Sequence, residues 1–316
     1  MSQSLINVDN VSKSYGGVKA NVDISMTVKQ GSITGIIGPN GCGKTTLFNS
    51  IVGYHPIDAG SIQFNGQEVS HLRVGEIARL GMLRTFQQTR IYTKMDCVDN
   101  MQISVSQRPG SKSSMFSSRK GEIRDRAEQL LEFVGLYSKR NLISGDLSFG
   151  QQKLLEFAMA LMNEPKVLLL DEPFSALDIL TADNLRNDLQ ALWQQKRTGM
   201  QAMLLVTHNI EEAAFFSDKI VLFGNNPGRV QETMEVELAH PRQDKMVAMQ
   251  AIMEEVYQKV AHINDAERPR GQRFKTITLY YRIPRVEVGS MIGLAEALVT
   301  EEFKQDSELS NLAEEL

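Results

Sequence analysis

The sequence has few cysteines and no long apolar run. Cys42 and Cys97 are its only cysteines among 316 residues, too few for a disulfide framework or a cysteine-based metal cluster. No stretch approaches the roughly 18–20 consecutive apolar residues that cross a bilayer. The first residues lack the basic and apolar regions of a signal peptide. These absences predict a cytoplasmic protein that reaches a membrane only through a partner.

An excess of positive charge is also missing. The net charge is −4 and the sequence pI is about 5.8, which disfavours a nucleic-acid binder with a broad basic surface. Apolar residues make up 42% of the chain and charged residues 23%, as in an ordinary soluble globular protein. A length of 316 residues suits one large domain with a smaller one, or two modest domains.

One glycine-rich stretch, residues 38–46, follows an apolar run at 33–37 and precedes apolar residues at helical spacing. This order of strand, loop and helix is the context that a phosphate-binding loop requires. Its glycines let backbone N–H groups turn inward around an anion, and the helix start adds a positive dipole end. We predict that Lys44 reaches the β- and γ-phosphates of a nucleotide and that the Thr45 hydroxyl binds Mg²⁺. The predicted binding residues of the loop are Gly38, Pro39, Asn40, Gly41, Cys42, Gly43, Lys44, Thr45 and Thr46.

Apolar runs alternate with helical patterns along most of the chain. Residues 167–170, 203–206 and 220–223 are continuously apolar, as in strands covered on both faces. Strands that alternate with helices predict an α/β protein with a largely parallel sheet. Residues 22–28 instead alternate apolar with polar, the pattern of a half-buried strand. A helical pattern at 245–262 follows the last strand.

The apolar run at 167–170 ends on Asp171 and Glu172. A carboxylate at the end of a buried strand can support Mg²⁺ through the water shell of the ion, and we assign this role to Asp171. A second carboxylate can polarise the water that attacks the γ-phosphorus, and we assign this role to Glu172.

A second anion-binding surface is predicted shortly before that strand. Ser148, Gly150 and Gln151 lie where a helix begins, and the free N–H groups of a helix N-terminus bind anions. Serine and glycine are also routine at helix starts, which is the simpler interpretation. A phosphate-binding loop alone fits a kinase, a GTPase or a motor ATPase. The second surface, and the lack of an Asn-Lys-x-Asp motif, disfavour a GTPase or a small-molecule kinase.

The phosphate loop, the Leu-Ser-Phe-Gly-Gln segment and the Asp-Glu strand end, in this order, resemble the ATPase subunits of ABC transporters over roughly residues 5–236. The resemblance implies a P-loop NTPase fold of the ABC-ATPase type. Such a fold has a mostly parallel core sheet, an antiparallel β part near the N-terminus and a helical signature subdomain, expected at about 90–163. We expect the ABC ATPase domain at 1–240. Residues 241–316 would form a small α/β or winged-helix-like accessory region, shorter than the family's usual one.

The resemblance also assigns roles that the local patterns do not. Tyr15 matches the aromatic residue that stacks on adenine. Gln87 matches the glutamine that contacts Mg²⁺ or water and couples to membrane subunits, with Gln88 as the adjacent rival. His208 matches the switch histidine that reaches the γ-phosphate. Residues 175–178 match the loop that crosses between two ATPase subunits.

By this resemblance ATP and Mg²⁺ are the cofactors, and ATP binds between the phosphate loop of one subunit and the signature helix of another. Phe149 stands where the family usually has glycine, but Gly150 is retained, so the signature is expected to work. The implied catalytic residues are Lys44, Gln87, Glu172 and His208, and the implied metal ligands are Thr45, Gln87 and Asp171.

The implied partners are a second ABC ATPase subunit, transmembrane permease subunits docked near Gln87 and, indirectly, a periplasmic or extracellular solute-binding protein. The chain would lie on the inner face of the cell membrane. Residues 15–103 look like branched-chain amino acid importer ATPases, whereas the chain from residue 172 onward looks like the nitrate, sulfonate and taurine importer group. The chain is therefore a natural mosaic or a fusion. Because the permease-contacting region lies in the first half, branched-chain amino acid import is favoured, with the nitrate, sulfonate and taurine class as the alternative.

Two other classes stay open: a soluble ABC ATPase acting on ribosomes or DNA, and a non-hydrolysing regulatory cassette. A single cassette without sustained heptads disfavours the first. Cys42 carries a separate hypothesis. A thiol at a helix N-terminus tends to have a lowered pKa, so alkylation of Cys42 is expected to inactivate the ATPase, with ATP protecting it.

Overall fold

The computed structural model describes residues 3–85, 91–105, 116–175, 177–195, 199–225, 227–242 and 245–266. They belong to one compact unit, Met1–Arg268. Helix α8 (Met246–Ala266) confirms the helix predicted at 245–262. The domain boundary at residue 240 stays a prediction, and the expected accessory fold beyond residue 266 lies outside the described residues. Within those ranges, no helix has both the length and the apolar character of a membrane span.

A six-stranded sheet with the strand order β10–β9–β3–β8–β7–β6 forms the centre of the unit. Neighbouring strands are parallel, except that β10 runs antiparallel to β9. The strands are β3 (Ile33–Ile37), β6 (Met82–Arg84), β7 (Val167–Asp171), β8 (Ala202–Thr207), β9 (Lys219–Gly224) and β10 (Arg229–Glu235). Every residue of β3, β7 and β8 is buried. The predicted largely parallel sheet is therefore confirmed.

The central strands separate two apolar cores. Leu168 and Leu170 of β7 join one buried cluster, whereas Val167 and Leu169 join the other. Successive side chains of a strand point to opposite faces of the sheet. A strand between two cores must therefore be apolar throughout, which explains the continuous run at 167–170.

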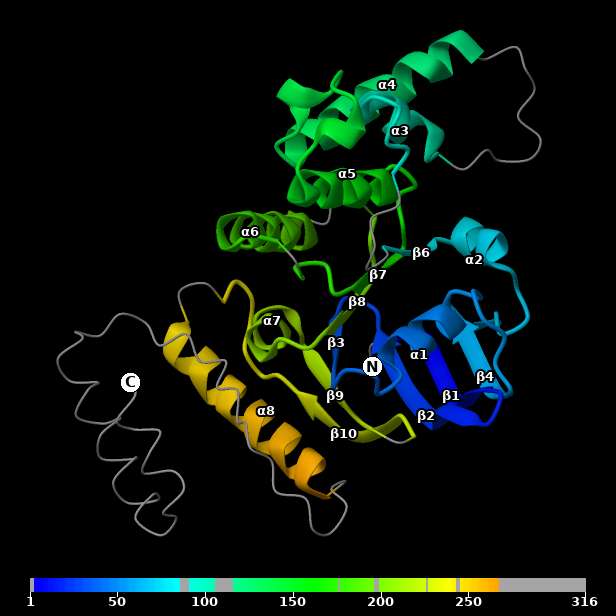
Figure 1. Ribbon diagram of the computed structural model, residues 1–316, viewed down its shortest axis with the longest axis vertical. Helices are drawn as coiled ribbons and strands as arrows, with labels where there is room; N and C mark the ends of the chain where they lie inside the picture. Colours follow the sequence, from blue (N-terminus) through cyan, green and yellow to red (C-terminus); the bar gives the residue numbers. More distant parts are fainter. Residues whose placement is uncertain are drawn as a thin grey trace, which may run out of the picture. The chain divides into compact units, whose positions relative to one another are not determined.

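A second, antiparallel sheet has the strand order β2–β1–β4–β5. Its strands are β1 (Ser4–Tyr15), β2 (Val18–Lys29), β4 (Ala59–Phe64) and β5 (Gln67–Glu68). Helix α1 (Lys44–Ile51) lies beside these strands (Figure 1) and buries Leu47, Phe48 and Ile51 in the same cluster as Val167 and Leu169. The helix that follows the glycine-rich loop is thus held between the two sheets.

Helices cover the other face of the central sheet. Figure 1 shows α3 (Cys97–Ile103), α4 (Phe116–Phe133) and α5 (Phe149–Leu161) packed together on the side away from β1, β2 and β4. These three helices fall within residues 90–163, where the helical subdomain is expected. The other helical elements are α2 (Val74–Leu80), a 3₁₀ turn at Tyr137–Lys139, another at Ser144–Asp146, α6 (Ile179–Gln195) and α7 (Ile210–Phe216).

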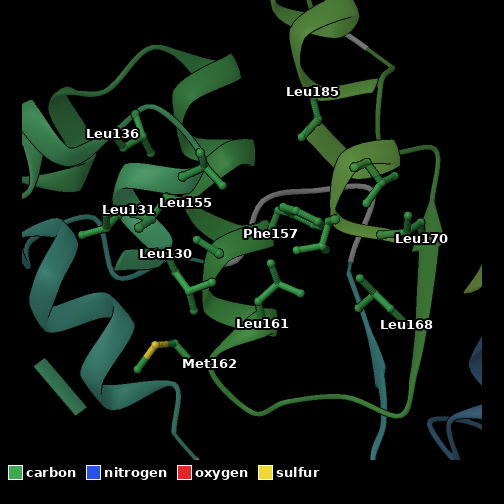
Figure 2. Close-up of a cluster of buried hydrophobic side chains, with 14 of the residues drawn as sticks. Leu130, Leu131, Leu136, Leu155, Phe157, Leu161, Met162, Leu168, Leu170 and Leu185 are labelled. Carbon is green, nitrogen blue, oxygen red and sulfur yellow. The ribbon is translucent and has the colours of Figure 1, made fainter. Parts of the chain in front are cut away.

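Leucine-rich packing fixes α5 against the strand that ends on Asp171. Figure 2 shows Phe157 of α5 on the side of Leu170 of β7 and Leu185 of α6, and Leu155 on the side of Leu130 and Leu131 of α4. A buried leucine or phenylalanine contributes about 1.5–3 kcal/mol relative to an exposed one. This cluster therefore sets the position of the α5 N-terminus relative to the end of β7.

Candidate functional site

The glycine-rich loop at 38–46 joins β3 to α1, and its geometry requires glycine. Gly43 has a φ of 90°, in the left-handed region that favours glycine. A Cβ atom on Gly43 would lie 2.4 Å from Asn21 Nδ2, and one on Gly38 would lie 2.7 Å from the Phe223 carbonyl oxygen. The loop is thus a backbone cradle packed tightly on its protein side, as a phosphate-binding nest requires.

Lys44 begins α1 and turns its ammonium back into this loop. Nζ donates to the carbonyl oxygens of Gly38 at 2.7 Å and Pro39 at 2.9 Å, and the residue is buried. No side chain caps the N-terminus of α1; Thr45 is exposed there and Thr46 is half-buried. An uncapped helix start beside a buried cation favours an anion.

Cys42 does not behave as the sequence predicts. Its side chain is buried in the loop, with Sγ 3.8 Å from Lys44 Nζ. Burial raises the pKa of the Cys42 thiol, and the Lys44 charge opposes this only in part. The expectation of a lowered thiol pKa is wrong, because the cost of removing a thiolate from water outweighs the nearby positive charge. Cys42 is a packed component of the loop.

Asp171 ends β7 as a buried carboxylate. Its Oδ2 accepts a hydrogen bond from Arg84 Nη2 at 2.6 Å, while its Oδ1 has no hydrogen-bond partner among the described residues. Burial raises the pKa of Asp171, and the Arg84 guanidinium opposes this; Lys44 is close enough to act in the same direction as Arg84. A buried carboxylate oxygen of this kind fits the predicted Mg²⁺ role, since Mg²⁺ takes oxygen ligands.

Glu172 and His208, both predicted to act near the γ-phosphate, are in contact. His208 Nδ1 lies 3.3 Å from Glu172 Oε1. The hydrogen bond to Glu172 raises the pKa of His208, although burial opposes it. Glu172 has a φ of 47°, and its N–H donates to the Val206 carbonyl oxygen at 2.9 Å. Strained backbone of this kind clusters at functional sites.

The start of α7, directly after His208, is fixed by residues that the sequence did not single out. Asn209 caps the helix. Thr207 Oγ1 donates to Glu212, and Arg186 Nη2 lies 3.2 Å from Glu212 Oε1. Burial raises the pKa of Glu212, whereas Thr207 and Arg186 oppose this. The asparagine followed three residues later by glutamate is a helix-start signal that could have identified this cap.

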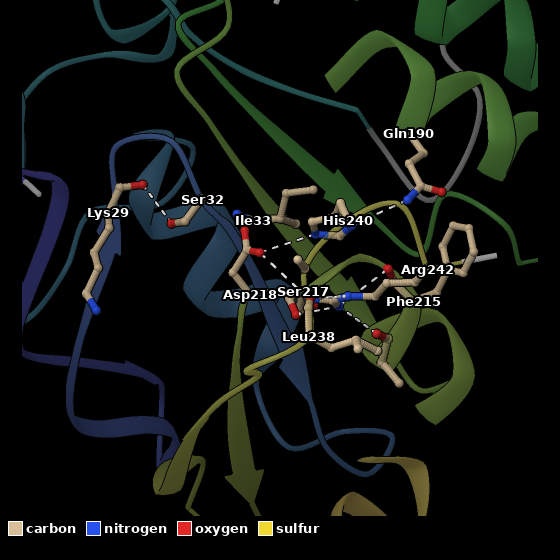
Figure 3. A network of polar contacts seen from close by, with 12 residues as sticks. Lys29, Ser32, Ile33, Gln190, Phe215, Ser217, Asp218, Leu238, His240 and Arg242 are labelled. Atoms are coloured by element: carbon tan, nitrogen blue, oxygen red, sulfur yellow. Dashed lines mark hydrogen bonds and ion pairs between the residues drawn. The ribbon is translucent and has the colours of Figure 1, made fainter. Parts of the chain in front are cut away.

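Arg242 holds the other end of α7. This fully buried guanidinium donates to the carbonyl oxygens of Ala214 at 2.7 Å and Ser217 at 2.9 Å (Figure 3). Nearby, Asp218 accepts the Ile33 N–H at 2.8 Å. The segment after β10 therefore ties α7 to the strand that leads into the phosphate loop. Nothing local in the sequence reveals this contact.

Ser148, Gly150 and Gln151 lie together at the start of α5. Ser148 Oγ accepts from the Gln151 N–H at 3.3 Å, and Gln151 Oε1 accepts from the Ser148 N–H at 3.2 Å. Lys139 Nζ also donates to Gln151 Oε1 at 2.9 Å. Among the described residues, no hydrogen bond joins this helix start to residues 38–46. The two predicted anion-binding surfaces therefore do not meet within one chain.

Tyr15 ends β1 with an exposed ring. The ring makes an edge-to-face contact with His55 at 5.6 Å between centroids, and Lys13 Nζ lies 5.4 Å from its centroid. Lys13 is itself held by Asp58 at 2.9 Å. An exposed aromatic ring braced by two neighbouring side chains fits the predicted adenine-stacking role. Sequence reasoning missed both His55 and Asp58.

Part of the predicted site lies outside the described residues. Gln87 and its rival Gln88 are there, as is Ala176 of the loop at 175–178. Asp178 of that loop is described: its Oδ1 accepts the Thr181 N–H at 3.0 Å, at the start of α6. The site described so far therefore comprises the loop at 38–46 and the ends of β7 and β8.

Comparisons with known proteins agree with this geometry. Residues 22–175 match the family model described as "ABC transporter". A taurine import ATP-binding protein, TauB, of Escherichia coli (strain K12) is 36% identical over 235 residues, which cover 74% of this chain and 86% of that protein. The TauB protein of Shigella flexneri gives the same identity and coverage.

Solved structures resemble the chain as well. A nucleotide-free ATP-binding cassette from an ABC transporter aligns with a TM-score of 0.67 at 25% identity, covering 83% of this chain and 99% of that one. A dimeric ATP-binding cassette in a post-hydrolysis state, bound to ADP and Pi, aligns with a TM-score of 0.64 at 25% identity, covering 74% of this chain and 100% of that one.

Proposed function

The chain belongs to the ABC transporter ATPases, and we propose that it powers the import of a small sulfonate of the taurine type. The observation that carries this proposal is the 36% identity to a taurine import ATP-binding protein over 86% of that protein's length. Branched-chain amino acid import, favoured from residues 15–103, has weaker support, because the relatives match the alternative class.

Lys44 and the start of α1 would hold the phosphates of ATP. The two carbonyl oxygens that now accept from Lys44 are neutral, whereas phosphate oxygens are charged and form stronger hydrogen bonds with an ammonium. Lys44 therefore exchanges its loop partners for phosphate oxygens. Tyr15 would stack on adenine with its exposed ring.

Thr45 and Asp171 would hold Mg²⁺, which when bound neutralises charge on the phosphates. Glu172 would polarise the attacking water, and His208 would contact the γ-phosphate. In the structure these two side chains contact one another at 3.3 Å. His208 engages Oε1 of Glu172, so a water polarised by that oxygen would share it with His208 or replace His208 there.

A second copy or a related subunit would complete the site with Ser148, Gly150 and Gln151. Ser148 and Gln151 bond to each other and Gln151 also bonds to Lys139, and among the described residues none of these hydrogen bonds reaches residues 38–46. Phe149 is exposed beside Ser148 and would face that partner. Gln87 would contact permease subunits, placing the chain at the inner face of the membrane.

Uptake assays test the proposed function. Cells that depend on this chain should lose uptake of labelled taurine when Glu172 is changed to Gln, while leucine uptake stays unchanged. Reconstitution with the co-purifying permease should show ATP hydrolysis stimulated by the taurine-loaded binding protein. Loss of leucine uptake with intact taurine uptake would reverse the substrate assignment. A chain that co-purifies with no permease, and whose hydrolysis no permease stimulates, would favour a soluble ABC ATPase.

A further inference from the structure

The guanidinium of Arg84 joins the two elements that carry the proposed Mg²⁺ ligands. Its Nη2 donates to Asp171 Oδ2 at 2.6 Å, and its Nη1 donates to the side-chain oxygen of Asn49 on α1. Asn49 lies four residues after Thr45, so both residues are on one face of that helix. We infer that Arg84 is a positioning residue that holds Thr45 and Asp171 at a fixed separation for one Mg²⁺. The inference rests on the proposed function and adds a residue to it.

The Arg84 guanidinium is held on several sides. The side chain is 5% exposed, its Nε donates to the Thr85 carbonyl oxygen at 3.2 Å, and its Cζ lies 5.7 Å from the Phe48 ring centroid. Guanidinium is planar and presents its donors in a rigid fork. Two arms of this fork therefore hold α1 and the end of β7 in a fixed relation.

The two oxygens of the Asp171 carboxylate have different surroundings. An arginine often pairs with both oxygens of a carboxylate, but here the second arm goes to Asn49 instead. Oδ2 is thus taken by Arg84, while Oδ1 has no protein partner among the described residues. The free oxygen suits the water shell of a cation, and the opposite charge of Arg84 offsets the cost of burying Asp171.

The position of Arg84 along the chain also matters. It is the last residue of β6, it pairs with Leu169 of β7, and it precedes Gln87 by three residues. Arg84 is therefore close in sequence to the segment proposed to contact the permease.

Mg²⁺ titrations of the wild type and Arg84→Met test the inference. Binding of a fluorescent ATP analogue is measured in EDTA and then with rising Mg²⁺, and hydrolysis at saturating ATP is followed over the same range. We expect Arg84→Met to bind the analogue in EDTA as the wild type does, because Lys44 and its loop are untouched. It should need about 10–100-fold more Mg²⁺, the usual effect of losing a partner that orients a metal ligand. Arg126→Met, which removes an arginine 3.5 Å from Glu164, is the matched control with unchanged Mg²⁺ dependence.

An Mg²⁺ requirement of Arg84→Met equal to that of the wild type would overturn the inference. If thermal unfolding shows that Arg84→Met is not folded, Arg84→Lys and Asn49→Ala replace it, since Arg84→Lys keeps the charge and Asn49→Ala removes only the α1 arm. A several-fold higher Mg²⁺ requirement in these variants supports the inference, and an unchanged requirement in both refutes it. Failure of the proposed function gives a different result: the wild type itself would show no Mg²⁺-dependent ATP binding. That result would refute both the proposed ATPase function and the positioning role of Arg84.

Discussion

The fully buried side chain of Asn100 on α3 allows a sharp test of the hydrogen-bond assignments. Its Oδ1 accepts the Tyr92 N–H at 2.7 Å. Its Nδ2 donates to the carbonyl oxygens of Tyr92, Met95 and Asp96 and to Ser144 Oγ at 2.9–3.3 Å. We predict that Asn100→Asp destabilises the protein more than Asn100→Ala, although aspartate is nearly the same size as asparagine.

Alanine would leave a single backbone group of this cluster without a partner. The Tyr92 carbonyl oxygen keeps Ser144 Oγ as a donor, the Met95 carbonyl oxygen keeps the Ser144 N–H, and the Asp96 carbonyl oxygen keeps the Asn100 N–H. The Tyr92 N–H loses its acceptor. An orphaned donor costs about 1–3 kcal/mol and the lost hydrogen bonds about 1 more. We therefore expect Asn100→Ala to lower the free energy of unfolding by about 2–4 kcal/mol.

In Asn100→Asp, one carboxylate oxygen can still accept the Tyr92 N–H. The other takes the place of Nδ2 and faces the four oxygens that accept hydrogen bonds from Nδ2 in the wild type. A buried carboxylate whose second oxygen faces three carbonyl oxygens costs more than an orphaned donor, so the expected loss is about 4 kcal/mol or more. Urea denaturation can follow the fluorescence of Trp193, the single tryptophan, which packs against the same apolar cluster as α3. The exposed Asn141 provides matched Ala and Asp controls, expected within about 0.5 kcal/mol of the wild type. Asn100→Asp at least as stable as Asn100→Ala would refute the assignment.

Further predictions concern the site itself. Glu172→Gln should abolish ATP hydrolysis and accumulate an ATP-bound dimer in size-exclusion chromatography; continued turnover would contradict its role. Because the Glu172 contact raises the pKa of His208, this contact stabilises the fold below the unfolded-state pKa, and the contribution is lost as pH rises through the folded-state pKa. Urea midpoints of His208→Gln should therefore depend less on pH than those of the wild type. Maleimide should label Cys42 only after unfolding, because burial raises its thiol pKa, and rapid labelling of the native protein would be the contrary result. Gly228→Ala should weaken ATP binding, since its Cβ would lie 2.1 Å from the Cys42 carbonyl oxygen, whereas Gly75→Ala, with open space around it, should not.

Features encoded by neighbouring residues could be predicted from the sequence. The strand, loop and helix around Lys44 follow from glycine spacing and apolar periodicity within a short segment. The central strand β7 follows from its apolar run and ends, as predicted, on Asp171. The contact between Glu172 and His208 depends on the strand order, which the sequence did not predict, because it arises where the parallel neighbours β7 and β8 end at the same edge of the sheet.

Features that depend on distant residues could not be predicted. Arg84 and Asp171 are separated by 87 positions, and no periodicity in either segment indicates the pair. The burial of Cys42 depends on packing around the loop, so the helix position alone gave the wrong direction for its pKa. The sequence alone does not show whether a polar side chain is buried, because burial of such a side chain depends on hydrogen-bond partners from distant segments.

Gly228 bears on the two resemblances found in the sequence, because it comes from the half that looks like taurine-type importers and packs on the half that looks like amino acid importers. Its N–H donates to the Ala20 carbonyl oxygen at 3.1 Å, and its carbonyl oxygen accepts the Val22 N–H at 3.0 Å. It has no room for a side chain beside the Cys42 carbonyl oxygen. The back of the phosphate loop is therefore built from both halves. Contacts this close tolerate little change on either side, so the two halves have to act as one domain whatever their separate resemblances.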